Sequence, residues 1–138
     1  MDQSFEMTIG SDIEVIPFVS ARFEEAMKEH GFGPEEILDT QLAVEEVITN
    51  IILHGYEETG GEIQISCTIT PGRIGILVTD SAPPFNPLSI PKPDLEEDME
   101  DRKIGGLGVY LLRQVMDEIS YRYENGKNIL TMIKMRAS

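Results

Sequence analysis

A carboxylate and an amide lie four residues apart in the apolar stretch "LAVEEVITNIILHGY" (residues 42–56). In an α-helix, Glu46 and Asn50 are about 40° apart around the axis and share a face, whereas Glu45 and Asn50 are about 140° apart. An Asn oxygen suits a hydrated Mg²⁺ ion, and a Glu carboxylate can accept a proton from an activated hydroxyl. A solvated helix face with a side-chain hydrogen bond has the same spacing, so this helix alone does not decide the chemistry.

Two further motifs are compatible with a bound ligand. Gly105, Gly106 and Gly108 precede a predicted helix, where backbone N–H groups can converge on a phosphate, although such glycines also serve as hinges or packing sites. Asp80 follows the apolar run "RIGILVT" and precedes "SAPPFNP", so it either ends a strand or faces a ligand. A Glu/Asn helix, a strand ending in Asp, a long loop and a glycine-rich helix start occur in that order in few folds, which favours the ligand.

Amphipathic helices are predicted to position these groups. Apolar residues recur every three or four positions across residues 12–30, with Gly31 as a natural stop. A second helix begins after Gly33 and runs to about His54, before Gly55. A third is predicted in "GGLGVYLLRQVMDEI", after the loop.

The strands predicted around these helices define the fold class. "SFEMTIG" suits an edge strand, and "EIQISCTIT" alternates so that Cys67 lies on the apolar face as a core residue. Residues 74–78 are apolar throughout, which predicts a central strand, buried on both faces and ending at Asp80. "ISYRY" and "NILTMIKM" form a closing hairpin around "ENGKN". These elements predict an α/β two-layer sandwich of about three helices on a mixed, largely antiparallel sheet.

Composition narrows the classes of partner. The 138 residues are 41% hydrophobic, which predicts a single domain over residues 1–138. Lys and Arg total 11 against 25 Asp and Glu, and the resulting net charge of −14 argues against nucleic acid or a membrane surface as a partner. One cysteine and a start without a basic, apolar leader predict a cytoplasmic protein.

Three segments together resemble a known family. "VEEVITNIILHGY", "LVTDSAPPFNP" and "GGLGVYLLRQVMDEISY" are similar to the N box, first glycine box and second glycine box of the GHKL ATPases, the superfamily of gyrase, heat-shock chaperones and histidine kinases. Within it they look most like the serine-protein kinase/anti-sigma factor branch, which has the histidine-kinase-like ATPase fold. The resemblance runs from about residue 5 to residue 135.

The resemblance implies a role for each motif. Asn50 would bind the Mg²⁺ that bridges the ATP phosphates, and Glu46 would take the proton from the attacking serine of a protein substrate. Asp80 would accept a hydrogen bond from the exocyclic amino group of adenine. The resemblance further implies that Gly105, Gly106 and Gly108 line the ATP phosphates, and that one lid cation, Arg102 or Lys103, reaches the γ-phosphate. It also implies that His54 and Tyr56 close the end of the helix beside the pocket.

The chain departs from the family pattern in the predicted ATP lid, residues 83–104, and near the C-terminus. Ala82 stands where a glycine is usual, and Pro83 and Pro84 replace residues that are commonly glycine or charged. The usual Gly-Thr pair that helps to hold adenine is replaced by "GKN", in which Asn128 either substitutes for the threonine or only shapes the turn.

The leading functional hypothesis is an ATP-dependent protein serine/threonine kinase that works by partner switching. It would hold a sigma factor or similar regulator, release it to a competing STAS-type antagonist, and restore the hold by phosphorylating that antagonist. The alternative is a nucleotide-dependent binding module with little or no kinase activity, motivated by Ala82 and the proline-rich lid. A histidine-kinase catalytic domain is less favoured, because neither His30 nor His54 lies in a helical phosphoacceptor segment. Homodimers are common in the family.

Overall fold

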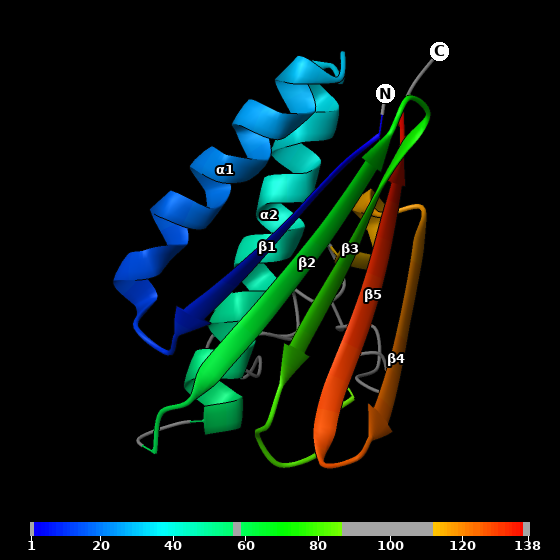
Figure 1. Cartoon of the computed structure of the whole chain (residues 1–138). Helices are drawn as coiled ribbons and strands as arrows, with labels where there is room; N and C mark the ends of the chain where they lie inside the picture. Colours follow the sequence, from blue (N-terminus) through cyan, green and yellow to red (C-terminus); the bar gives the residue numbers. More distant parts are fainter. Residues whose placement is uncertain (1, 57–58, 87–111, 137–138) are drawn as a thin grey trace, which may run out of the picture.

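Helices packed on one face of an antiparallel sheet make up the fold (Figure 1). The computed structural model describes residues 2–56, 59–86 and 112–136. The strand order is β1-β2-β3-β5-β4, and every neighbouring pair is antiparallel. The elements in chain order are β1 (Gln3–Gly10), η1 (Ile13–Val15), α1 (Ile16–Glu29), α2 (Pro34–Asn50), η2 (Ile51–Tyr56), β2 (Glu62–Thr70), β3 (Arg73–Asp80), β4 (Glu118–Glu124) and β5 (Lys127–Met135).

The predicted fold class is confirmed, with one correction to the sheet. The first strand lies at an edge and β3 lies at the centre, as predicted. Along β3, Ile74, Ile76 and Val78 are buried, but Leu77 is 36% exposed. The prediction of a strand buried on both faces is therefore wrong, because the helices in the described part of the chain cover only one face of the sheet (Figure 1).

Apolar residues that alternate along the strands pack against the apolar faces of the helices in a single core. On β2, Cys67 and its alternate neighbours face α1 and α2, and Cys67 is 1% exposed, which confirms its predicted place. Burial raises the pKa of the Cys67 thiol to about 12, so it stays protonated near neutral pH.

Residues 112–115 are helical and belong to the predicted third helix, whose earlier residues lie outside the described part. No helix among the described residues is long and apolar enough to cross a membrane.

The end of α2 differs from the prediction. The α-helix stops at Asn50, and the chain continues to Tyr56 as the π-helix η2 instead of ending near His54. Single π-helical turns of this kind are common beside functional sites. Tyr56 fixes this ending, because its hydroxyl donates to the carbonyl of Glu62 (2.6 Å) and accepts from the N–H of Ser81 (2.8 Å).

Tyr56 fits against the sheet only because a glycine faces its ring. A Cβ atom on Gly61 would lie 2.3 Å from Cε1 of Tyr56, which is far below any real contact. Gly60 adopts a φ of +71°, a conformation that favours glycine. The "GG" pair at residues 60–61 therefore turns the chain and makes room for the tyrosine at the same time.

We expect Gly61→Ala to lower the free energy of unfolding by about 1–3 kcal/mol, because the added methyl overpacks the Tyr56 ring. Urea unfolding followed by circular dichroism measures the change. Gly72→Ala is the matched control, since a Cβ on Gly72 meets nothing within 4 Å. Equal midpoints for the wild type and Gly61→Ala would contradict the packing argument.

Candidate functional site

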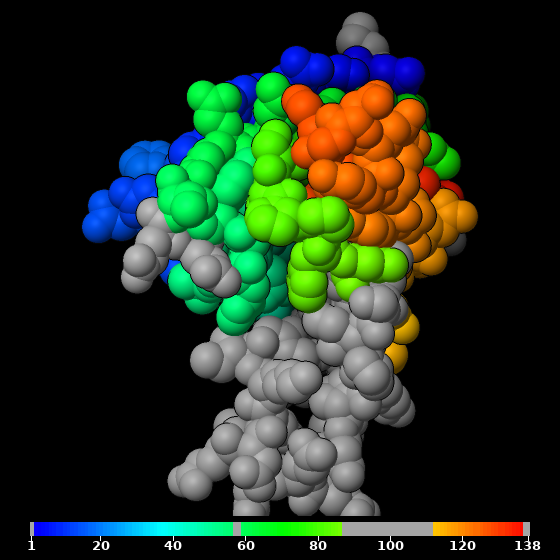
Figure 2. All heavy atoms as spheres, turned by 90° about the horizontal axis from the view of Figure 1, so that it is seen from below, coloured from blue at the N-terminus to red at the C-terminus, as the bar shows by residue number. Residues whose placement is uncertain are grey.

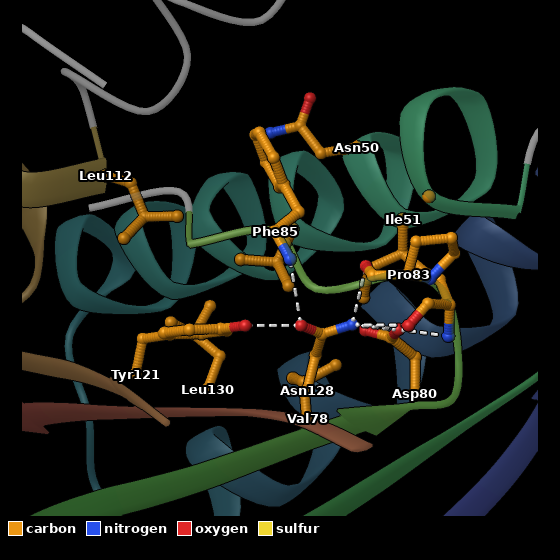
Figure 3. A pocket seen from close by; sticks show the side chains of 13 residues that line it. Asn50, Ile51, Val78, Asp80, Pro83, Phe85, Leu112, Tyr121, Asn128 and Leu130 are labelled. Carbon is orange, nitrogen blue, oxygen red and sulfur yellow. Dashed lines mark hydrogen bonds between the residues drawn. The ribbon is translucent and has the colours of Figure 1, made fainter. Parts of the chain in front are cut away.

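A pocket lies between the helix layer and the sheet, where β3 ends (Figure 3). Figure 2 shows the segment after β3, in yellow-green, between the green end of the helix and the orange β4–β5 hairpin. The walls are largely apolar with a few polar groups, as is typical of small-molecule sites. The lining residues come from every side of the pocket: Val47, Asn50, Ile51, Gly55, Val78, Asp80, Ala82, Pro83, Phe85, Leu112, Tyr121, Asn128 and Leu130.

Asn50 and Glu46 share one face of α2, and of the two only Asn50 lines the pocket. Nδ2 of Asn50 donates to Oε1 of Glu46 at 3.2 Å, so the two side chains share a face as their spacing predicts. Asn50 is 9% exposed, and its Oδ1 accepts no hydrogen bond from any described residue. Because the amide nitrogen is turned to Glu46, the oxygen is the atom left to bind a cation or another donor.

The two adjacent carboxylates of α2 have different surroundings. Burial raises the pKa of Glu46, and this effect is opposed by the hydrogen bond from Asn50 and by the nearby His54. A carboxylate with a raised pKa is a better proton acceptor near neutral pH. Glu45 instead faces α1, where Oγ of Ser20 donates to its Oε1 at 2.6 Å. Glu46 is therefore the carboxylate beside Asn50, and Glu45 ties the two helices together.

Asp80 is buried at the end of β3 and lines the pocket. The residue is 6% exposed. Its Oδ1 accepts from the N–H of Ala82 and from Nδ2 of Asn128, both at 2.9 Å. Its Oδ2 accepts no hydrogen bond from any residue in the described ranges. A buried carboxylate oxygen without a donor is costly, and Oδ2 is therefore suited to a ligand N–H.

Asn128 is the polar centre of the pocket floor, and sequence reasoning left its role open. The turn before it is formed by Asn125 and Gly126, whose φ angles of 52° and 76° are typical of a two-residue hairpin. Asn128 is the second residue of β5 and lies directly opposite Asp80 in the β3–β5 register. The Asn-Gly signal predicts the β4–β5 hairpin and its register, but the pairing of Asn128 with Asp80 depends on how β3 aligns with β5, which the turn does not set.

The Asn128 side chain connects five groups around the pocket, as the dashed lines of Figure 3 show. It is 6% exposed. Its amide oxygen accepts from the N–H of Phe85 (3.1 Å) and from the Tyr121 hydroxyl. Its Nδ2 donates to three oxygens, namely Oδ1 of Asp80 and the carbonyls of Ala82 (3.0 Å) and Pro83 (3.2 Å). This network holds the start of the predicted lid against β5.

The unusual Ala82 fits the pocket wall. Ala82 is 4% exposed, and a Cβ on Gly55 would lie 3.1 Å from its own Cβ. The Ala82 methyl therefore lies against the bare backbone of Gly55 in η2. The glycine on the helix makes room for the extra methyl at a position where the resembled family has glycine.

The remaining residues that the sequence predicts for the site either do not line the pocket or lie outside the described ranges. His54 is exposed on η2 and does not line the pocket, although its charge acts on Glu46. Tyr56 does not line the pocket either, and it closes the helix end through Ser81. The predicted phosphate-side residues lie outside the described ranges, as does the lid beyond Asn86: Arg102, Lys103, Gly105, Gly106 and Gly108.

Comparisons with known proteins relate this geometry to a family. A family model for the histidine kinase-like ATPase domain matches residues 10–134. The chain is 28% identical over 132 residues to the serine-protein kinase RsbW of Bacillus thuringiensis (strain Al Hakam), covering 93% of this chain and 82% of the relative. RsbW of Bacillus mycoides (strain KBAB4) is similar to the same extent.

A solved structure supports the fold. The RsbU and RsbW domains of a Mycobacterium tuberculosis protein align with a TM-score of 0.67 at 18% identity, over 99% of this chain. The chain spans 33% of the length of that solved chain. Because the family model covers nearly the whole sequence, the resemblance drawn from the three motifs is confirmed, and the chain belongs to the histidine kinase-like ATPase domain family.

Proposed function

We propose that this chain binds Mg²⁺-ATP in the pocket and transfers the γ-phosphoryl group to a serine of a protein partner. The observation that carries the proposal is that Asn50, next to Glu46, and Asp80 line one apolar pocket although they come from different elements. The similarity to RsbW serine-protein kinases supports the choice of a serine as acceptor.

The apolar part of the pocket suits a purine base. Ile51 comes from the helix side, and Val78 and Leu130 come from the sheet, so a flat ring can be enclosed between the layers. The exocyclic amino group of adenine would donate to Oδ2 of Asp80. This pairing gives a donor to an oxygen that accepts from none of the described residues.

The donor set of Asn50 fits Mg²⁺. Its Oδ1, which accepts from no residue in the described ranges, is a hard oxygen ligand, and Mg²⁺ commonly takes few protein ligands together with waters and phosphate oxygens. When bound, the ion would neutralise the charge on the phosphates. Asn50 would hold it at the α2 side of the pocket, next to Glu46.

Glu46 would act on the incoming hydroxyl. As the serine oxygen forms its bond to the γ-phosphorus, the bond from that phosphorus to the β–γ bridging oxygen breaks and ADP leaves. The serine proton passes to the Glu46 carboxylate, whose pKa is raised by burial. Asn50 orients that carboxylate through its Nδ2 hydrogen bond.

The proposed partners follow from the same resemblance. They are a sigma factor or similar regulator and a STAS-type antagonist that carries the serine, met in the cytoplasm, with a homodimer as the proposed assembly. A binding module with little or no kinase activity is the alternative. Its support from Ala82 is reduced, because the methyl is accommodated by Gly55.

Calorimetry with ATP and Mg²⁺ tests the site directly. We expect ATP and ADP to bind, and Asn50→Ala to remove most of the Mg²⁺ dependence of the affinity because the metal loses its amide ligand. Thr49→Ala, on the same helix but outside the pocket lining, should keep that dependence. If neither nucleotide binds the wild type at millimolar concentration with Mg²⁺ present, the proposed function is wrong.

The base should be selected through Asp80. We expect ATP to bind roughly ten- to a hundredfold more tightly than GTP, because an unpaired buried polar group costs about 1–3 kcal/mol. Equal dissociation constants for the two nucleotides would remove Asp80 from this role.

Glu46→Gln should slow phosphoryl transfer by at least about a hundredfold and leave ATP affinity nearly unchanged, because it keeps the side-chain size but removes the proton acceptor. Single-turnover transfer to a verified STAS-type partner isolates the chemical step.

Glu45→Gln is the matched control for this measurement, since its side chain faces Ser20 on α1. It should transfer phosphate at nearly the wild-type rate. A Glu46→Gln variant as fast as the wild type would show that the proton goes elsewhere. No transfer by the wild type to a verified partner would favour the binding module.

A further inference from the structure

The protein itself occupies one oxygen of the Asp80 carboxylate. Oδ1 accepts from the N–H of Ala82 and from Nδ2 of Asn128, each at 2.9 Å. An ionised carboxylate offers about two acceptor positions on each oxygen, so Oδ1 is full. Oδ2 accepts from no described residue. A ligand in the pocket therefore finds one available oxygen on Asp80 and not two.

The orientation of the Asn128 amide is fixed by its other partners. Its oxygen faces two donors, the N–H of Phe85 and the hydroxyl of Tyr121. Turning the amide over would set Nδ2 against these donors and set the amide oxygen against Oδ1 of Asp80. The network thus determines which end of the amide faces Asp80, and that end is the donor.

A carboxylate with one free oxygen distinguishes two purine edges. Adenine presents one donor, the 6-amino group, beside the acceptor N1. Guanine presents two adjacent donors, N1–H and the 2-amino group, and this pair matches a carboxylate with both oxygens open. If Oδ1 is full, guanine can pair with Oδ2 but its second donor stays unpaired in a buried site.

We propose that Asn128 is a specificity-determining residue, which disfavours guanine by occupying Oδ1 of Asp80. The inference rests on the proposed nucleotide binding. Asn128 acts through Asp80 and needs no contact with the base, because its amide is already engaged on both ends. This role differs from both possibilities left open by the sequence, which were a replacement adenine contact and a turn former.

The first test compares GTP with inosine triphosphate on the wild-type protein, each displacing a fluorescent ATP analogue. Hypoxanthine keeps the N1–H and the 6-oxygen of guanine but lacks the 2-amino group. If Oδ1 is full, inosine triphosphate should bind at least as tightly as GTP. GTP binding about tenfold more tightly would mean that the 2-amino group has a partner, and the inference would be wrong.

The second test removes one of the two donors to Oδ1 of Asp80. Asn128→Ala removes one donor from Oδ1, so the affinity for GTP relative to inosine triphosphate should rise about tenfold. Tyr123→Phe is the control, because Tyr123 lies opposite Asn128 on β4 but does not line the pocket. The ratio of the two affinities in this control should match the wild type.

The outcomes separate the inference from the proposed function. If Asn128→Ala weakens ATP, GTP and inosine triphosphate by one factor, Asn128 only supports the pocket and the inference fails. The inference also fails if neither GTP nor inosine triphosphate, at millimolar concentration, displaces the fluorescent ATP analogue from the wild type or from the Asn128→Ala variant. The wild-type comparison decides the question if the variant does not fold. No ATP binding by the wild type overturns the proposed function as well.

Discussion

The burial of one carboxylate at the end of β3 governs the arrangement around the pocket. Asp80 is 6% exposed, so its charge needs donors that water would otherwise supply. The backbone of Ala82 and the amide of Asn128 supply two, and both partners are thereby fixed in place. The segment after β3, the second residue of β5 and the pocket floor are held together because this carboxylate must be satisfied.

On the helix side of the pocket, one polar pair is satisfied within the protein and another is satisfied only in part. Ser20 and Glu45 satisfy each other between α1 and α2, whereas Glu46 pairs with Asn50, which lines the pocket. The Glu46–Asn50 pair is partly satisfied, because the Oδ1 of Asn50 accepts from no described residue. Polar groups that are completed within the protein stabilise the fold, whereas incomplete ones are available to a ligand.

Much of the fold could be predicted from periodicity, because β2 and the helices each bury one regular face. The failures have physical causes. A run of apolar residues does not reveal that β3 has solvent on one side at Leu77, and helical periodicity does not reveal the change to π geometry after Asn50. Spacing alone placed Glu46 beside Asn50, since both lie on one helix. Asn128 was not assigned, because its role depends on the register between β3 and β5.

The hydroxyl of Tyr56 gives the pocket a mechanical property. It joins the last residue of η2 to Ser81, the neighbour of Asp80, while Leu53 on the same helical turn is 46% exposed. A displacement of η2 from outside would therefore pull on the backbone next to Asp80. The outer end of the helix and the backbone that carries Asp80 therefore share one mechanical connection.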